Sequence, residues 1–192
     1  SNKDKVLKAI IKNFPKENLI INDNYYHALI NSIIGQQISV SAANAIKNRF
    51  FCINKTIVPK KVLNFKEISL KECGLSRQKI LYINNISNFF ILNKDFFKNI
   101  NKNKENEIKE RLISIKGVGN WTADMFLLFS YGSSDIFPRG DLGFIKAISK
   151  SYKKKLPISE VYLEKLQKKW SPYNSVATWY LWRSLDPFPV SY

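Results

Sequence analysis

The carboxylate of Asp141 is a candidate for chemistry in this sequence. It lies in the segment FPRGDLGFIKAI (137–148), where a Pro-Arg-Gly loop leads into a run with apolar residues at helical spacing. Asp124, Asp135 and Asp186 are rival carboxylates. An aspartate at the start of a helix usually caps it, because its side chain accepts a hydrogen bond from the first turn. The local sequence therefore favours a helix cap at Asp141 over a catalytic group.

The segment IKGVGNWTADMFLLFS (115–130) is a candidate site for an anion. Two glycines separate two runs with helical spacing, so the chain turns tightly and a new helix begins at once. Because glycine permits positive φ and has no Cβ, successive N–H groups can point outward at the start of that helix. Such a turn can bind a DNA phosphate without reading sequence, and a plain helical hairpin with a glycine C-cap is the alternative. The residues that we expect to contact DNA here are Lys116, Gly117, Val118, Gly119 and Thr122.

The cysteines and the histidine give little support to metal or nucleophilic catalysis. Cys52 and Cys73 have no second cysteine or histidine beside them, and His27 is the single histidine. A zinc or iron–sulfur ligand set cannot be assembled from these residues, and the thiols fit buried positions. His27 fits a packed helix residue better than a catalyst. We therefore expect no metal site of this kind and no Ser/His or Cys/His pair.

Positive charge is the strongest global feature of the sequence. The 192 residues contain 31 Lys and Arg against 15 Asp and Glu, which gives a formal net charge of +16 and a pI near 9.8. An excess of this size favours nucleic acid as a partner over a solvated basic surface or an anionic membrane. The 45% hydrophobic and 14% aromatic fractions indicate a folded chain.

No segment of the sequence has the length of a bilayer span. The longest unbroken apolar run is MFLLF (125–129), and the first ten residues lack the apolar stretch of a secretory signal. We expect an intracellular protein without membrane contact, in the cytoplasm or at the nucleoid of a bacterium, or in the nucleus of a eukaryote.

Helical spacing of apolar residues recurs along the whole sequence, and no alternation long enough for a sheet interrupts it. Prolines lie between the helical runs, as helix breakers should. The predicted fold class is all-α, without a low-complexity linker or an internal repeat. The predicted helices span residues 4–14, 24–39, 39–51, 77–92, 106–115, 121–131, 141–152, 159–170 and 175–185.

Four blocks of the sequence resemble the helix-hairpin-helix DNA glycosylase superfamily. Residues 112–148 are similar to its hairpin and downstream aspartate, most of all in the branch of 3-methyladenine DNA glycosylase II. SIIGQQISVSAANAI (32–46) resembles an early helix pair, GLSRQKILYI (74–83) a middle helix, and WSPYNSVATWYLWRSL (170–185) the C-terminal helix. The order of the four blocks makes the resemblance specific, because a hairpin alone occurs in many DNA-binding proteins.

The resemblance implies a bilobed all-α fold with the active site in the cleft between two helical lobes. The central lobe would span residues 24–132 and include the hairpin, and the second lobe would join residues 1–23 to residues 133–192. Because some bacterial members carry an additional N-terminal β domain for which this chain has no room, we expect a minimal two-lobe form. The implied protein is a monomer that binds double-stranded DNA containing damaged bases.

The resemblance assigns the catalytic role to Asp141, and none of the rival aspartates stands at the matching position. Cleavage of an N-glycosidic bond builds positive charge on the deoxyribose, which a carboxylate can stabilise while it orients a water molecule. An alkylated purine is already cationic and leaves without being protonated, so a histidine acid is not required. Electron-rich rings can select such a base through cation–π stacking.

The resemblance also implies residues for the base pocket and for base flipping. Trp121 and Trp182 match pocket tryptophans of related glycosylases, with core packing as the alternative, and Met125 stands where some relatives have a tyrosine. Gln37 stands at the position of the wedge that fills the gap left by a flipped base, where some relatives have an apolar residue. Gln36 beside it fits a structural role in the turn. Trp170 and Trp179 fit the core better.

Bifunctional members of the superfamily carry a lysine two residues after the second hairpin glycine, where this sequence has Trp121. Lys116 precedes the first glycine and is a poor substitute by position. The prediction is a monofunctional glycosylase of base excision repair that hydrolyses alkylated purines such as 3-methyladenine, with at most a monovalent cation at the hairpin carbonyls. The alternatives are a glycosylase for another damaged or mismatched base and a non-catalytic, structure-specific DNA-binding protein.

Overall fold

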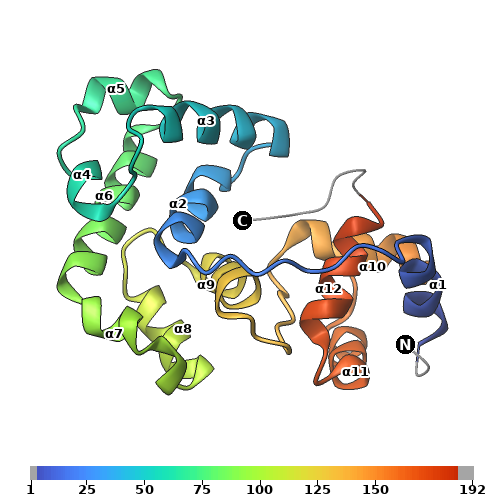
Figure 1. Ribbon diagram of the computed structural model, residues 1–192. Helices are drawn as coiled ribbons and strands as arrows, with labels where there is room; N and C mark the ends of the chain where they lie inside the picture. Colours follow the sequence, from blue (N-terminus) through green and yellow to red (C-terminus); the bar gives the residue numbers. More distant parts are fainter. Residues whose placement is uncertain (1–3, 186–192) are drawn as a thin grey trace. The chain divides into compact units, whose positions relative to one another are not determined.

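The computed structural model describes residues 4–185, and the regular elements in that range are all helices (Figure 1). The predicted all-α class is confirmed. None of the helices described combines the length and apolar character of a membrane span. The chain divides into two compact units: unit 1 comprises residues 4–21 and 127–185, and unit 2 comprises residues 22–126. The boundaries expected from the sequence fell after residues 23 and 132.

Unit 2 is built around the buried helix α2 (Tyr25–Gly35). Seven of the 11 residues of α2 are buried, so the helix is covered on most sides and not along a single stripe. It packs against α3 (Val40–Cys52), α6 (Arg77–Leu92) and α9 (Asn120–Phe126). The other helices of the unit are α4 (Pro59–Val62), α5 (Glu67–Glu72), α7 (Lys94–Lys98), η1 (Ile100–Lys102) and α8 (Glu105–Ile113).

The predicted helix 24–39 is wrong at its C-terminal end, because α2 ends at Gly35. The next helix begins after Ser39, whose hydroxyl accepts a hydrogen bond from the Ala42 N–H at 3.2 Å. Gln37, between the two helices, has a φ of 58°, in the left-handed region that non-glycine residues rarely adopt. The left-handed residue therefore lies in a turn that separates the two predicted helices, and the serine cap starts the second of them.

Unit 1 joins the beginning of the chain to its last third. It contains α1 (Lys5–Asn13), α10 (Leu142–Tyr152), α11 (Glu160–Trp170) and α12 (Asn174–Arg183). Helix α12 packs against the other three. These helices share one core although the sequence separates α1 from the rest by more than a hundred residues.

The core of unit 1 is rich in aromatic rings. Phe137 contacts Phe144 edge to face at 4.8 Å between centroids and contacts Trp170 at 5.7 Å. Trp170 and Trp179 are both buried, which confirms their predicted place in the core. Packed aromatic rings of this kind give the unit a dense interior around the start of α10.

The predicted helix 121–131 changes its hydrogen-bond register part-way. Helix α9 is α-helical, whereas η2 (Leu127–Tyr131), the first element of unit 1 to follow it, is a π-helix. The Ser133 N–H donates to the Leu127 carbonyl at 2.9 Å just beyond this turn. All residues from 122 to 130 are buried, so the apolar pattern has no polar face that would reveal the change of register.

Candidate functional site

Asp141 is the N-cap of α10, as its local sequence predicts. Its backbone is extended, with φ −87° and ψ 113°, and its Oδ1 accepts a hydrogen bond from the Phe144 N–H at 2.5 Å. The Asp141 N–H donates to the Pro138 carbonyl at 3.0 Å, which closes the loop before the helix. The side chain is half-buried. The carboxylate is therefore fixed by the helix that it caps while part of it stays accessible.

Trp182 on α12 holds the same carboxylate. Its indole Nε1 donates to Asp141 Oδ1 at 2.9 Å, across 41 positions of sequence. The ring lies parallel to Phe129, with 5.8 Å between centroids and 14° between planes, and the residue is 7% exposed. The sequence predicts a ring face for stacking on a base, whereas the structure places the polar edge of this ring against the carboxylate.

Gly143 belongs to the same arrangement, and sequence reasoning did not select it. A Cβ at this position would lie 3.2 Å from Asp141 Oδ1 and 3.6 Å from Trp182 Nε1. Any larger residue would crowd the hydrogen bond between carboxylate and indole. A glycine inside the first turn of a helix lowers the stability of that helix. The presence of such a residue at position 143 is the sequence signal that could have identified Gly143.

The loop that carries Asp141 is anchored to α11 through Arg139. Its guanidinium donates to the Glu160 carboxylate at 2.8 Å and to the Gln167 side-chain carbonyl at 2.7 Å. These contacts are largely exposed, so each is weak on its own. The two terminal nitrogens of the guanidinium bind different side chains of α11, and together they restrict its orientation. Arg139 therefore orients the loop two residues before the carboxylate.

Two of the rival aspartates have structural roles. Asp135 accepts hydrogen bonds from the Ser171 hydroxyl at 2.7 Å and from the Asn174 side-chain amide at 2.5 Å, and so it fixes the start of α12. Asp124 pairs with Lys109 at 2.5 Å and links α9 to α8. Burial raises the pKa of Asp124, and the Lys109 ammonium opposes this rise without reversing it. Asp186 lies outside the described residues.

The two hairpin glycines of unit 2 serve different purposes. Gly117 has a φ of 108°, and a Cβ there would lie 2.2 Å from Cγ of Tyr82, so neither conformation nor space permits a side chain. Gly119 does not have positive φ, and no atom lies within 4 Å of a Cβ built on it. Of the two properties expected of these glycines, Gly117 uses the positive φ, whereas Gly119 contributes the missing Cβ and leaves open space at the start of α9.

The hairpin is tied to neighbouring helices by side-chain amides. Gln36 at the end of α2 donates to the Gly117 carbonyl at 3.1 Å and to the Thr122 hydroxyl at 3.0 Å. Asn85 on α6 donates to the Lys116 carbonyl at 3.0 Å. The predicted structural role of Gln36 is confirmed. The turn is consequently rigid before any ligand binds.

The structure limits which hairpin residues can reach a phosphate. Lys116 and Gly119 are exposed, whereas the side chains of Val118 and Thr122 are buried. The Val118 N–H already donates to the Ile115 carbonyl at 2.9 Å, and the Thr122 hydroxyl accepts from Gln36. The side chains of Val118 and Thr122 are therefore used inside the unit, and the DNA contact expected of these two residues stays a prediction that would need their backbone. The first-turn N–H groups of a helix lack partners within that helix and remain the candidates.

The other predicted site residues of unit 2 differ in exposure. Trp121 is partly exposed at the start of α9, whereas Met125, one turn later, is 1% exposed. Gln37 is exposed in the left-handed turn between α2 and α3. Trp121 and Gln37 can therefore meet a ligand directly, and Met125 can act only from the interior of the unit.

Metal ligands and hairpin carbonyls bear on the cation that the sequence allows at the hairpin. Between residues 4 and 185, no group of three or more His, Cys, Asp or Glu side chains could hold a metal ion. The carbonyls of Lys116 and Gly117 each accept a side-chain amide. A monovalent cation at the hairpin would have to share these carbonyls with Asn85 and Gln36, and it stays a prediction.

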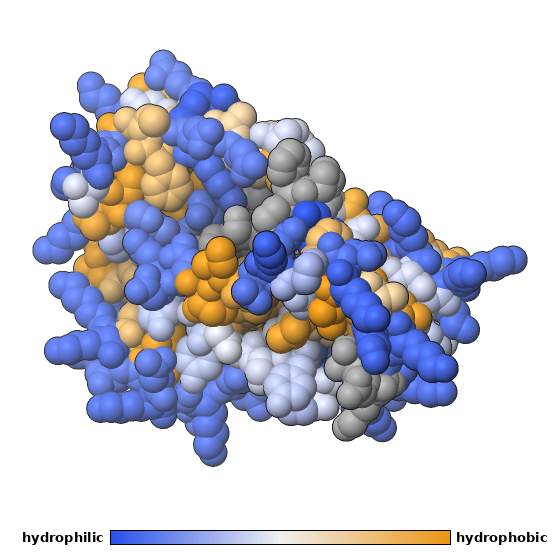
Figure 2. Space-filling view, turned by 45° about the vertical axis from the view of Figure 1, so that its right-hand side comes forward, coloured by the Kyte–Doolittle hydropathy of each residue, from blue (hydrophilic) through white to orange (hydrophobic). Residues whose placement is uncertain are grey.

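Exposed lysines supply positive charge in both units. Hydrophilic side chains cover much of the face seen in Figure 2, with apolar patches between them. Lys153, Lys154 and Lys155 are exposed after α10, and Lys116 is exposed beside the hairpin of unit 2. These four cations therefore lie at the surface, where they can meet a polyanion.

Comparison with known proteins assigns the chain to a family. The family described as HhH-GPD superfamily base excision DNA repair protein matches residues 30–174. The chain belongs to this superfamily. The HhH-GPD match spans both the hairpin and Asp141, which confirms the resemblance seen in the sequence.

Individual relatives of this HhH-GPD chain have related names. DNA-3-methyladenine glycosylase 1 of Schizosaccharomyces pombe is 30% identical over 185 residues, which cover 94% of this chain and 81% of the relative. Alkylbase DNA glycosidase-like protein mag2 of the same yeast is 34% identical, covering 82% of this chain and 76% of the relative. The solved structure of the S. pombe 3-methyladenine DNA glycosylase in complex with abasic DNA is 28% identical, with a TM-score of 0.83 over 94% of this chain and 91% of that chain. These names agree with the predicted enzyme class and branch.

Proposed function

We propose that this HhH-GPD chain is a monofunctional DNA glycosylase that hydrolyses the N-glycosidic bond of alkylated purines such as 3-methyladenine. The names of its relatives support the reaction and the kind of base. The observation in this chain that carries the proposal is the half-buried carboxylate of Asp141, whose Oδ1 accepts two N–H donors at 2.5 and 2.9 Å. A carboxylate held in this way is oriented before the substrate arrives.

Asp141 acts on the charge that develops during bond cleavage. The bond between C1′ and the base nitrogen breaks, the base keeps the bonding electrons, and the deoxyribose becomes positively charged. A preorganised negative group that faces this charge accelerates the step by about 100-fold or more. Water then forms a bond to C1′ and gives its proton to the carboxylate or to solvent. The products are the free base and an unbroken strand with an abasic sugar.

Trp182 positions the Asp141 carboxylate in this mechanism. Its N–H bonds the carboxylate, and Gly143 leaves the room that this bond needs. Trp121, which is partly exposed, is then the ring that stacks on the cationic base, with a gain of about 0.5 to 2 kcal/mol per cation–π contact. Met125 shapes the pocket from the interior of unit 2. Gln37 fills the gap that the flipped base leaves.

DNA binding depends on the hairpin and on Lys116 beside it. The first-turn N–H groups of α9 and the Lys116 ammonium bind phosphates, and Gly119 lets the backbone of DNA approach closely. These contacts do not read sequence, so binding extends to undamaged DNA. We propose that the chain acts as a monomer on double-stranded DNA, in the compartment of the cell that holds the DNA.

The experiment that tests the proposal is release of free base from duplex DNA treated with a methylating agent. We expect chromatography to detect 3-methyladenine with the wild-type chain and little with Asp141→Asn. A panel of duplexes with oxidised, deaminated or mismatched bases tests the other glycosylase specificities. If no base is released from any substrate, the chain is a non-catalytic DNA-binding protein and the proposal is wrong.

A second measurement tests the monofunctional assignment. Because Trp121 stands where bifunctional relatives have a lysine, borohydride should trap no covalent complex between protein and DNA, and the product strand should stay intact until alkali is added. A trapped complex would show that another lysine attacks C1′ and would overturn this part of the proposal.

A further inference from the structure

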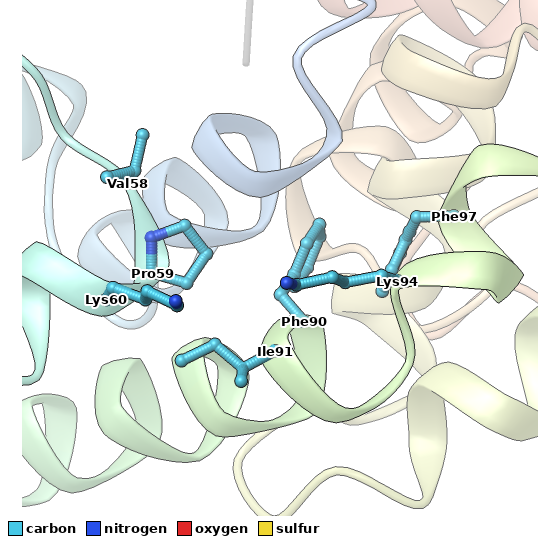
Figure 3. A pocket seen from close by; sticks show the side chains of 7 residues that line it. All are labelled: Val58, Pro59, Lys60, Phe90, Ile91, Lys94 and Phe97. Carbon is cyan, nitrogen blue, oxygen red and sulfur yellow. The ribbon is translucent and has the colours of Figure 1, made fainter.

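Unit 2 contains a cavity away from the hairpin and from every residue given a role above. Its volume is about 370 Å³, and it lies between the start of α4 and the end of α6 with α7 (Figure 3). Two lysines and five apolar side chains line it: Val58, Pro59, Lys60, Phe90, Ile91, Lys94 and Phe97. The mechanism proposed for DNA repair uses none of these residues.

The floor of the cavity is aromatic and already formed. Phe90 and Phe97 stack with 3.7 Å between centroids and 9° between planes. Tyr26 meets Phe90 edge-on at 5.2 Å, and Phe96 meets Phe97 edge-on at 5.0 Å. Because Phe90 and Phe97 are already held by neighbouring rings, they lose little conformational entropy when a ligand binds. The cavity is therefore preorganised for an apolar group.

Two positive charges flank this apolar floor. Lys60 and Lys94 are exposed, and in Figure 3 the nitrogen ends of both side chains point toward the space between the helices that carry them. Within the described part of the chain, neither ammonium forms an ion pair. Val58 at the edge of the cavity is 38% exposed, so part of the apolar lining faces solvent.

This combination fits one kind of ligand better than others. Duplex DNA would use the lysines and leave the apolar floor in contact with water. A small polar metabolite would need several convergent hydrogen-bonding groups, whereas the lining offers two ammonium groups at its edge. A protein segment that inserts one large apolar side chain and carries carboxylates beside it would use both features at once.

We propose that the groove lined by Phe90, Phe97, Ile91 and Pro59 docks a short acidic segment of a partner protein. One aromatic or branched aliphatic side chain of that segment enters the cavity, and neighbouring carboxylates pair with Lys60 and Lys94. The proposal does not rest on the glycosylase activity, because the groove shares no residue with the proposed catalytic or DNA-binding groups.

The test uses a fluorescein-labelled peptide with Phe-Leu at its centre and Glu or Asp residues on both sides. We expect fluorescence anisotropy with the full chain to give a Kd on the order of 10 to 100 μM at physiological salt. One reference peptide has Ala-Ala at the centre, and another has Gln and Asn in place of the acids. Each reference peptide should bind at least about 10-fold more weakly, because each lacks one of the two features.

Protein variants locate the peptide on the groove. The double variant Lys60→Glu, Lys94→Glu should weaken peptide binding by about 10-fold or more, with unchanged base release. The control Lys165→Glu, Lys168→Glu makes the same change of charge at exposed positions of α11 and should weaken binding by less than about twofold. Equal losses in the two double variants would mean general attraction between charges and would overturn the proposal.

Two further outcomes would also overturn it. The first is no saturable binding of the acidic Phe-Leu peptide up to about 1 mM. The second is a loss of affinity for undamaged duplex DNA that is confined to the Lys60→Glu, Lys94→Glu variant. That result would assign the two lysines to the DNA-binding surface and leave the apolar floor without a ligand.

Discussion

Asp4 and Asp141 are two helix caps of the same unit with different surroundings. Asp4 accepts two backbone N–H bonds from the first turn of its helix and Asp141 accepts one, and each also accepts a bond from a tryptophan indole. Asp4 is 3% exposed, and its Oδ2 is enclosed by Tyr152 at 2.9 Å, Trp170 at 3.0 Å and Lys169 at 3.0 Å. Asp141 is half-buried, and both its backbone donor and its indole donor end on Oδ1.

The comparison shows that the same kind of cap can leave a carboxylate enclosed or accessible, so capping α10 is compatible with the catalytic role proposed for Asp141. Full burial commits the Asp4 carboxylate to joining α1, α10 and α11. Partial exposure lets the Asp141 carboxylate face a substrate while the cap sets its orientation. The chemical difference between the two aspartates therefore lies in their surroundings, because the residue type and the cap geometry are shared.

Among these variants, Asp141→Asn should have the largest effect on base release. A normal rate in this variant would contradict the difference between Asp141 and Asp4. Asparagine Oδ1 can accept both hydrogen bonds, so the free energy of unfolding should fall by at most about 1 kcal/mol. The single-turnover rate of base release should fall by about 100-fold or more, because the negative charge is lost. DNA affinity of the same variant should persist. Cleavage at a rate near that of the wild type would reduce Asp141 to a helix cap.

Asp4→Ala should affect stability and leave the chemistry intact. The change removes the α1 cap and leaves the half-buried Tyr152 hydroxyl and the buried Trp170 indole without their acceptor. We expect urea denaturation to show a loss of about 3 kcal/mol, with a normal rate of base release per folded molecule. Asp23→Ala, at an exposed aspartate, is the control and should cost less than about 0.5 kcal/mol.

The same carboxylate should make unit 1 sensitive to acid. Burial alone would raise the pKa of Asp4, but the hydrogen bonds from Trp170, Lys169, Tyr152 and the backbone hold it below its ordinary value of 3.8. Its contribution to stability is therefore present above pH 3.8 and is lost as the pH falls through the lower value of the folded state. In Asp4→Ala this part of the acid dependence should disappear from the unfolding curves.

Trp182→Phe should slow base release less than Asp141→Asn does, and it tests how the surroundings of the Asp141 carboxylate matter. Phenylalanine keeps a ring beside Phe129 and loses the N–H that orients Asp141. We expect base release to slow by about 10-fold, with lesion affinity unchanged, since only the orientation of the carboxylate suffers. Trp179→Phe, at a buried tryptophan of the same helix, should leave the rate within about twofold. A loss confined to lesion affinity would instead support the stacking role that the sequence predicts for Trp182.

Gly119→Val should give the smallest effect, and it should change DNA binding and not the rate of base release. A Cβ at this position meets no atom of the protein within 4 Å, so the stability should change by less than about 1 kcal/mol. Affinity for undamaged duplex should fall by about fivefold for every sequence, because the side chain obstructs a phosphate. The affinity should also fall steeply with salt, with a log–log slope of about −0.9 per phosphate contacted. Gly117→Ala is the contrast, because its clash with Tyr82 should lower stability.

The sequence by itself determined the features that depend on neighbouring residues. Apolar spacing predicts the helices, and prolines and capping residues place most of their ends, because these signals act within one or two turns. Asp141 as a cap and the turn at Gly117 followed from the same local chemistry. The order of four family-like blocks indicated the superfamily. Local signals failed at Gln37, which adopts a left-handed conformation. They also failed at the change to a π-helix in residues 127–131, because the burial of residues 127–130 conceals the register.

Only the tertiary structure decided which distant residues contact Asp141 and Gly117. The bond from Trp182 to Asp141 joins residues that are 41 positions apart, and the Tyr82 ring that forbids a side chain at Gly117 comes from another helix. Periodicity states that a residue faces the interior, but it cannot say which atom of a distant helix lies there. For this reason the family resemblance could only suggest Trp182 for the base pocket, and the fold was needed to place its N–H on the carboxylate.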